Sequence, residues 1–321
     1  MNTALLALTE ELRRLKATGV KYVSVSDESV ATLRTVLAAR RGTPAPARAT
    51  QPARSVAPTT TTAPAAANTE GGAASWQPPA IVAKAKKTPV ERDPSIPAIP
   101  EPKPFALPEG DKAARMATLR EHVLADSVCR EHVRPGKHVV VGVGSLDARI
   151  MFVGEAPGAE EEVQGEPFVG PAGQLLTKMI GAMGLNRSDV YIGNIMNWRP
   201  EMPLDASGVQ YGNRPPTEEE MRYCLPYLRA QIEIVNPALL VALGTTAAQG
   251  LLGIGAFKAL SEVRGRWTEF AGKPLMVTYH PSYILRNQSN RSKRMIWEDL
   301  LQVMERAGLA ISDKQRTFFL G

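Results

Sequence analysis

The sequence contains few of the residues that cross-link small proteins or bind metals. Only two of its 321 residues are cysteines, Cys129 and Cys224, and they lie far apart in the chain. Two cysteines are too few for a disulfide framework and too few for a four-thiolate metal site. Neither a disulfide-rich domain nor a metal module built on cysteine alone is therefore indicated.

Long apolar runs are also missing. No stretch reaches the roughly 20 apolar residues that a membrane-spanning helix needs. The N-terminal residues mix acids with bases and have no continuous apolar core, so we expect no secretory signal. The composition is otherwise ordinary, with 44% hydrophobic and 22% charged residues. We therefore expect a cytoplasmic protein with no membrane contact.

The formal net charge of +6 comes from the N-terminal third of the chain. Residues 1–108 carry 14 Lys and Arg against 8 Asp and Glu, whereas residues 109–321 carry 24 of each. Any nucleic-acid surface on the second segment must therefore be a local patch rather than a global positive field.

Composition divides the chain into three parts. Residues 1–42 place leucines at helical spacing and predict a small helical segment, which is either an appendage or a docking element for a protein partner. Residues 43–108 hold more than half of the 26 prolines, with many Ala and Thr, and predict a disordered linker. Residues 109–321 predict one globular domain, which we expect to be monomeric.

The globular part alternates short apolar runs with helical patterns. Strands are predicted at 149–153, 190–195, 239–243 and 275–279, and helices at 112–124, 172–183, 217–235, 245–252 and 291–307. Residues 139–143 predict a further short strand or extended segment, and Pro226 predicts a kink or break in its helix. This alternation predicts an α/β fold, a three-layer α/β/α sandwich around a central four-stranded parallel sheet.

Polar residues follow three of these strands, at the sheet edge where open α/β sheets bind ligands. Glu155 and Glu161 lie in one Gly/Pro-rich loop and could position and activate a water molecule. Phe168 offers a flat face for stacking, and Asn194 can donate one hydrogen bond and accept another at a ring edge. His280 can stabilise an anionic leaving group. Together these residues predict a site for a planar heterocycle.

Bulky and basic residues come directly after His280. Tyr283 and Leu285, with the intervening Ile284, could wedge into a base stack, and Arg286 could meet a phosphate. Further cations gather nearby in the sequence, at Arg264, Arg266, Arg291, Lys293 and Arg294. These cations are a candidate for the local nucleic-acid-binding patch. The alternative is a cluster of solvated charges without a binding role.

In combination and in this order, the motifs resemble the uracil-DNA glycosylase superfamily, specifically its family 4 enzymes. The resemblance covers roughly residues 115–310 and rests on GEAPG at 154–158, GEPFVGPAG at 165–173, YIGN at 191–194, RP at 199–200, NR at 213–214, CLPYL at 224–228 and HPSY at 280–283. It implies a hydrolase of base excision repair that flips uracil out of DNA and cleaves its N-glycosidic bond, leaving an abasic site.

The resemblance also implies roles for individual residues. Glu155 and Glu161 would organise or activate the water, and His280 would stabilise the charge that develops on uracil O2. The residues expected to bind uracil are Ala156, Phe168 and Asn194, and those expected to contact DNA are Tyr283, Leu285, Arg286, Arg291, Lys293 and Arg294. The alternative is a non-catalytic nucleic-acid-binding or polymerase-associated module of the same fold, against which the retained site residues speak.

One departure concerns a cofactor. The family 4 enzymes usually carry a [4Fe–4S] cluster on four cysteines, and only Cys129 and Cys224 match those positions here. Asp126 stands near a third position, and Trp198 replaces the cysteine before Arg199-Pro200. A cluster needs four good ligands, and an indole is not one. We therefore expect no metal and no cluster, with Trp198 filling the volume.

Overall fold

The computed structural model describes residues 99–205 and 208–320. The predicted helical segment at 1–42 and the linker as far as residue 98 lie outside the described residues. Within the described part, Ile99, Phe105 and Leu107 are half-buried against the main apolar cluster. Packing against the core therefore begins upstream of residue 109, where we placed the start of the domain.

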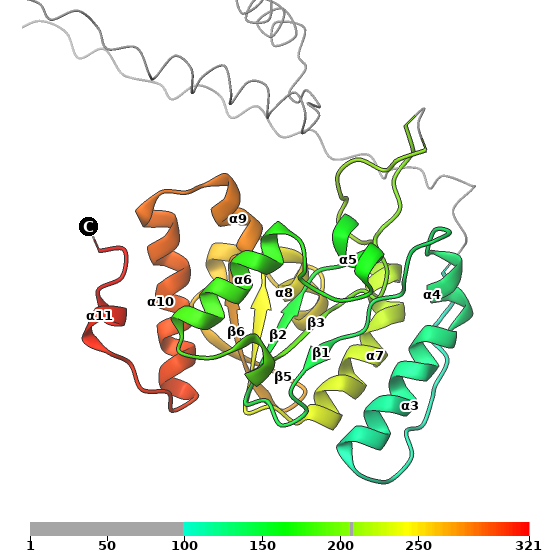
Figure 1. The fold of residues 1–321 in the computed structure, drawn as a ribbon, viewed down its shortest axis with the longest axis horizontal. Coiled ribbons are helices and arrows are strands. Elements are labelled where there is room, and N and C mark those ends of the chain that lie inside the picture. The colour runs from blue at the N-terminus through cyan, green and yellow to red at the C-terminus, as the bar shows by residue number, and fades with distance from the viewer. Residues whose placement is uncertain (1–98, 206–207, 321) are drawn as a thin grey trace, which may run out of the picture. The chain divides into compact units, whose positions relative to one another are not determined.

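A six-stranded mixed sheet forms the centre of the described domain, with the strand order β1-β3-β2-β4-β6-β5 (Figure 1). Its four inner strands are parallel, and they are β3 (Tyr191–Asn194), β2 (Ile150–Gly154), β4 (Leu239–Leu243) and β6 (Lys273–Thr278). These are the four predicted strands, so the α/β class and its parallel core are confirmed.

Two antiparallel strands that were not predicted as part of the sheet complete its edges. β1 (Val143–Gly144) pairs with β3, and β5 (Trp267–Phe270) pairs with β6. The predicted extended segment at 139–143 leads into β1 and is buried over most of its length. The sheet is therefore mixed rather than purely parallel.

Helices form most of the connections between the strands. They are α3 (Lys112–Ala125), α4 (Ser127–Glu131), α5 (Ala159–Gln164), α6 (Pro171–Ala182), α7 (Glu218–Val235), α8 (Thr245–Leu252), α9 (Pro281–Arg286), α10 (Asn290–Arg306) and α11 (Asp313–Arg316), with 3₁₀ turns η1 (Arg187–Asp189) and η2 (Leu260–Glu262). The long helices match their predicted ranges within the usual uncertainty of helix ends. A break at Pro226 is wrong, because α7 continues through it. No helix of the described ranges is long and apolar enough to cross a membrane.

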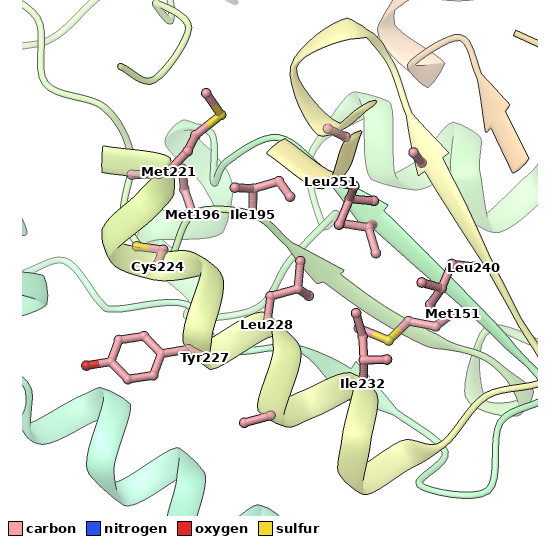
Figure 2. Packing of buried hydrophobic residues seen from close by; sticks show 14 of the residues in the cluster. Met151, Ile195, Met196, Met221, Cys224, Tyr227, Leu228, Ile232, Leu240 and Leu251 are labelled. Carbon is pink, nitrogen blue, oxygen red and sulfur yellow. The ribbon is translucent and has the colours of Figure 1, made fainter. Parts of the chain in front are cut away.

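The strands pack a layer of helices on each face of the sheet. Along β2, Met151 and Val153 enter the cluster that contains residues of α3, α7 and α8, whereas Ile150 and Phe152 enter the cluster that contains residues of α6 and α10. This alternation follows from the two-residue period of a strand. Figure 2 shows Ile232 of α7 beside Met151 on the first face. The carboxyl ends of the inner strands are thereby held at one edge of a rigid core.

Candidate active site

A cavity of about 700 Å³ opens at the carboxyl edge of the parallel strands. Its walls come from the loops after β2, β4 and β6 and from the starts of α5, α6 and α9. Of the residues predicted for catalysis or uracil binding, the lining includes Glu155, Ala156, Glu161, Phe168 and His280. The segments that carry them are far apart in the sequence, and the sheet brings them to one place.

Asn194 and Phe168 lie against each other beside Gly154. A Cβ atom at position 154 would lie 2.4 Å from Asn194 Oδ1 and 2.4 Å from Phe168 Cζ, so only glycine leaves room there. The Asn194 side chain belongs to a residue that is 7% exposed, and among the described residues its Oδ1 accepts no hydrogen bond. A buried acceptor without a donor is costly unless a ligand supplies one.

His280 caps the N-terminus of α9 with its own ring. Nδ1 accepts a hydrogen bond from the Ser282 backbone N–H at 3.2 Å and lies 2.8 Å from Ser282 Oγ. A neutral imidazole whose Nδ1 accepts carries its proton on Nε2, which leaves Nε2–H as a donor. Burial, assisted by the positive charge of Arg286, lowers the pKa of His280 to about 4. The ring is therefore neutral at neutral pH.

The loop after β4 supplies residues that the sequence analysis missed. Gly244 has a φ of 91°, and a Cβ atom there would approach His280 Cβ to 2.9 Å. Thr245 and Thr246 line the cavity directly after it. A signal for them was present, because they follow a predicted strand at its carboxyl end, like the other site residues.

The two carboxylates of the loop after β2 have different surroundings. Burial raises the pKa of Glu155, while a hydrogen bond with Thr246 partly opposes that shift. Glu161 accepts hydrogen bonds from the backbone N–H groups of Gly158 (3.1 Å), Val169 (3.0 Å) and Gly170 (2.9 Å). Glu155 is thus a carboxylate poised to take a proton, whereas Glu161 ties two loops of the cavity together.

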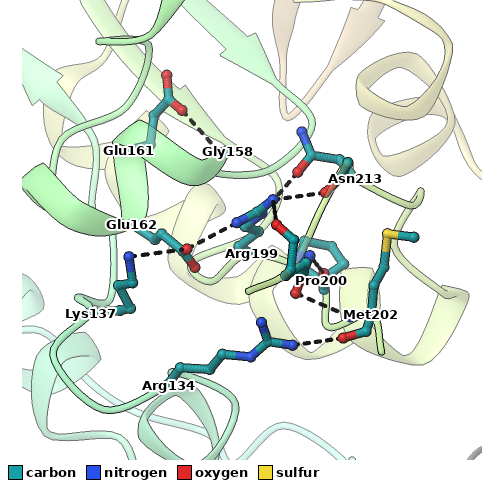
Figure 3. A network of polar contacts seen from close by, with 11 residues as sticks. Arg134, Lys137, Gly158, Glu161, Glu162, Arg199, Pro200, Met202 and Asn213 are labelled. Carbon is teal, nitrogen blue, oxygen red and sulfur yellow. Dashed lines mark hydrogen bonds and ion pairs between the residues drawn. The ribbon is translucent and has the colours of Figure 1, made fainter. Parts of the chain in front are cut away.

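A buried ion pair supports the cavity from behind (Figure 3). Arg199 Nη1 lies 3.0 Å from Glu162 Oε1, and the two side chains are 5% and 12% exposed. Arg199 also donates to Asn213 Oδ1 at 2.8 Å and to the Gly212 carbonyl at 2.7 Å. Because Asn213 lines the cavity, this network fixes the segment that precedes α7 at the rim.

The residues predicted to contact DNA occupy different surroundings. Tyr283 and Arg286 line the cavity, and Leu285 is 41% exposed on the same short helix. Arg291 is exposed at the start of α10. Ile284 is buried at 8% exposure and so is not available as a wedge.

Several of the predicted cations have structural contacts instead. Arg294 donates to Glu298 at 2.9 Å and to the carbonyls of Arg316 and Phe318, so it anchors the C-terminal segment on α10. Lys293 Nζ lies 6.0 Å from the centre of the Phe319 ring. Arg264, outside the predicted DNA-contact set, pairs with the buried Asp299 at 3.0 Å. A basic run in the sequence is therefore not one continuous basic surface here.

The residues at the family's cluster positions form a packed core. Cys129 and Cys224 are fully buried, and the hydrogen bond between their thiols, together with burial, raises the pKa of Cys129. Trp198 is fully buried too, and its ring stacks on His132 with centroids 5.0 Å apart and planes 11° apart. The indole therefore occupies the place where the resemblance would put a third thiolate.

Asp126 does not complete a ligand set either. Its Oδ1 accepts from the Cys129 backbone N–H at 2.7 Å and caps α4, while Oδ2 accepts from the hydroxyls of Tyr223 (2.8 Å) and Tyr227 (3.0 Å). Burial tends to raise the pKa of Asp126, but these hydrogen bonds outweigh it and lower the pKa. At the four positions the chain therefore offers two thiols, an indole and a hydrogen-bonded carboxylate, a donor set that does not fit a four-ligand cluster.

The fold is an α/β fold with its main cavity at the carboxyl edge of the parallel strands, where proteins of this class bind ligands. Residues 141–301 match the uracil DNA glycosylase superfamily, and the chain belongs to this superfamily. It is 44% identical over 186 residues to the type-4 uracil-DNA glycosylase of Thermotoga maritima, a match that covers 58% of this chain and 91% of the relative.

Two further relatives support the same membership. The type-4 uracil-DNA glycosylase of Archaeoglobus fulgidus is 39% identical over 186 residues, covering 56% of this chain and 85% of the relative. That of Pyrobaculum aerophilum is 40% identical over 163 residues, covering 49% of this chain and 78% of the relative. The resemblance to the family 4 enzymes is confirmed.

Proposed function

We propose that the chain is a hydrolase of base excision repair that removes uracil from DNA. The observation that carries this proposal is the buried, unpaired Asn194 Oδ1 beside the Phe168 ring. Uracil presents an N3–H donor next to its O4 acceptor, and an amide complements both. Cytosine presents the reverse pattern and would set acceptor against acceptor. Asn194 and Phe168 thus select a flipped uracil by its edge and its face.

The bond to be broken joins uracil N1 to C1′ of the deoxyribose. Its electron pair leaves with the base, and His280 Nε2–H donates to uracil O2 as negative charge develops there. A water molecule adds to C1′, and Glu155 takes its proton. Burial of Glu155 suits this task, because a raised pKa makes its carboxylate a better base. Ala156 lines the cavity and is assigned to uracil binding. We assign Glu161 to loop positioning.

The test is excision from a labelled oligonucleotide that contains one uracil. We expect the purified protein to create an alkali-labile site at that uracil, in a U:G duplex or in a single strand, and none in the same strand with cytosine or thymine. Absence of cleavage from both uracil substrates would favour the non-catalytic binding module and reject the glycosylase.

The pH dependence of the excision rate should follow the titration of Glu155 rather than that of His280. Because the pKa of His280 is lowered to about 4, no inflection is expected near 6.5, the usual pKa of imidazole. Because the pKa of Glu155 is raised above its ordinary value of 4.5, its carboxylate becomes protonated at a higher pH than usual on acidification. The excision rate should therefore fall in a pH range above 4.5. Single-turnover excision between pH 4.5 and 9 checks this. An inflection near 6.5 that disappears in His280→Asn would contradict it.

We further propose that the chain contains no iron–sulfur cluster, and that Trp198 and Asp126 stand at or near two ligand positions of the family's cluster site. The support is the fully buried Trp198 stacked on His132 and the hydrogen-bonded Asp126 carboxylate. Iron and acid-labile sulfide measured on anaerobically purified protein should both be far below one per chain. Four iron atoms per chain would overturn the proposal.

The substrate that follows from these proposals is uracil-containing DNA. A cytoplasmic location, a monomeric state and a protein partner for residues 1–42 stay predictions. Gel filtration coupled to light scattering would test the monomer.

A further inference from the structure

A second cavity, of about 520 Å³, lies beside α5 and has a strongly positive lining. Its charged side chains are Arg120, Arg130, Arg134, Lys137 and, as the one acid, Glu166, with His138 next to them. Residues 109–321 carry equal numbers of cations and acids, so four cations to one acid is a local concentration of positive charge. Nothing proposed above for uracil uses this cavity.

Two of these cations have no carboxylate partner among the residues that the structure describes. Arg120 and Arg130 form no ion pair with any of the described residues, whereas Lys137 lies 3.6 Å from Glu162, whose carboxylate is already paired with Arg199. Guanidinium groups that outnumber the acids around them repel one another unless an anion binds between them. Arginine forks match the oxygens of a phosphate.

The loop after α4, which carries Arg134 and Lys137, is held in place at several points. His132 stacks on the buried Trp198 at the start of the loop. Arg134 donates to the Met202 carbonyl at 2.7 Å, and the His138 backbone N–H donates to the Glu162 carbonyl at 2.8 Å. A loop fixed in this way presents its charges in one arrangement, so binding an anion costs little ordering.

The two cavities share α5. Gly158 to Glu161, at the start of the helix, line the active-site cavity, and residues 164–166, at its end, line the cationic one. Figure 3 shows Glu161 and Gly158 on one side of Glu162 and Lys137 and Arg134 on the other. A six-residue helix is about 9 Å long at 1.5 Å per residue. One DNA strand carries a phosphate about every 3.4 Å along the helix axis, so this is roughly three nucleotides.

We propose that the cationic cavity binds a backbone phosphate of the DNA strand that enters the active site, about three nucleotides from the flipped uracil. The inference rests on the proposed uracil-DNA substrate and adds a second contact to it. A free polyphosphate has the same chemistry and is the competing ligand.

The test reverses two cations and compares a variant of equal charge. The double variant Arg120→Glu/Arg130→Glu, called the lining variant, changes the lining of the cationic cavity. The control, Arg149→Glu/Lys314→Glu, makes the same change in net charge at exposed positions that line neither cavity. Binding of a labelled, uracil-free 15-nucleotide strand is followed by fluorescence anisotropy between 50 and 200 mM salt. The lining variant should bind 10-fold or more weakly, with a salt slope shallower by about one to two. The control should stay within about 2-fold of the wild type.

Substrate length gives a second readout. On a 15-nucleotide strand with a central uracil, the lining variant should show a kcat/KM at least 10-fold below that of the control. On a trinucleotide with a central uracil, which is too short to reach the cavity, the difference between the two should shrink to under 3-fold. Arg130→Glu alone, at an exposed position, should show a smaller loss of the same kind if the double variant fails to fold.

Three results would overturn the inference. Equal DNA affinity of lining variant and control is the first. Equal relative losses on long and short substrates is the second. The third result concerns tripolyphosphate. If tripolyphosphate binds the wild type 10-fold more tightly than the lining variant, while the two proteins bind DNA equally well, the cavity is a site for free phosphate. Because the anisotropy assay uses DNA without uracil, a protein that binds through this cavity but excises nothing would reject the glycosylase and not the contact.

Discussion

Replacement of His280 by alanine is expected to lower the single-turnover rate of uracil excision about 100- to 1000-fold. Loss of one preorganised donor to a developing negative charge has an effect of this size, about 2.7–4 kcal/mol in the barrier. The Nε2–H of His280 is such a donor, because Nδ1 is already engaged with Ser282 and the lowered pKa keeps the ring neutral. The measurement is cleavage of a uracil oligonucleotide under excess enzyme.

The same substitution removes a helix cap, so stability needs its own control. His280 Nδ1 accepts the Ser282 N–H at the start of α9, and loss of such a cap costs about 1 kcal/mol. His280→Asn restores a good capping residue without placing a donor where Nε2 lies, and it should remain nearly as slow as the alanine variant. His122→Ala, at an exposed position of α3, should keep its rate. A His280→Ala rate within 5-fold of the wild type would show that another group supports the leaving base.

Replacement of Trp198 by alanine is expected to reduce the free energy of unfolding by about 3–5 kcal/mol. The indole is fully buried, stacks on His132 and lies 6.2 Å from the Tyr223 ring. Its removal therefore leaves a large void between α4 and α7, and a void in a close-packed core is only partly closed by relaxation. Urea unfolding followed by circular dichroism gives the difference.

The matched control uses the same change at the sheet edge. Trp267 is half-exposed on β5, so Trp267→Ala should cost clearly less than Trp198→Ala. A Trp198→Ala variant as stable as the wild type would mean that the indole does not replace a structural element. Iron bound by the wild-type protein would contradict the proposal that the core contains no cluster.

The inner part of the fold could be read from the sequence because its strands are buried on both faces. β2 and β4 are apolar from end to end, and the rule that ligands lie beyond the carboxyl ends of parallel strands then located Glu155, Asn194 and His280. β5 could not be found in this way. Its Thr268 and Glu269 are exposed, and its pairing depends on a hairpin turn rather than on an apolar pattern.

The basic residues around the site were harder to predict than the residues inside the active-site cavity. Sequence proximity suggested one basic patch after His280, yet Arg294 is engaged by carbonyls of the C-terminal segment. The cations of the second cavity come from α3, α4 and the loop that follows. They come together only when α3 and α4 pack on the body of the domain, and no periodic pattern in the sequence records that. The presence of tryptophan instead of cysteine at position 198, in contrast, could be recognised from the sequence, because this residue directly precedes the Arg199-Pro200 motif.

The proposed replacement of a cluster by Trp198 has a consequence for how the protein would mature in a cell. An enzyme that folds around a cluster depends on iron supply and on the machinery that builds and inserts the cofactor, and it can be inactivated when oxidants remove the metal. Under the proposal that no cluster is bound, a core closed by an indole, an imidazole and two buried cysteines is complete as soon as the chain has folded. Uracil repair by this chain should therefore continue during iron starvation or oxidative stress, when deaminated bases still form and cluster-dependent enzymes fail.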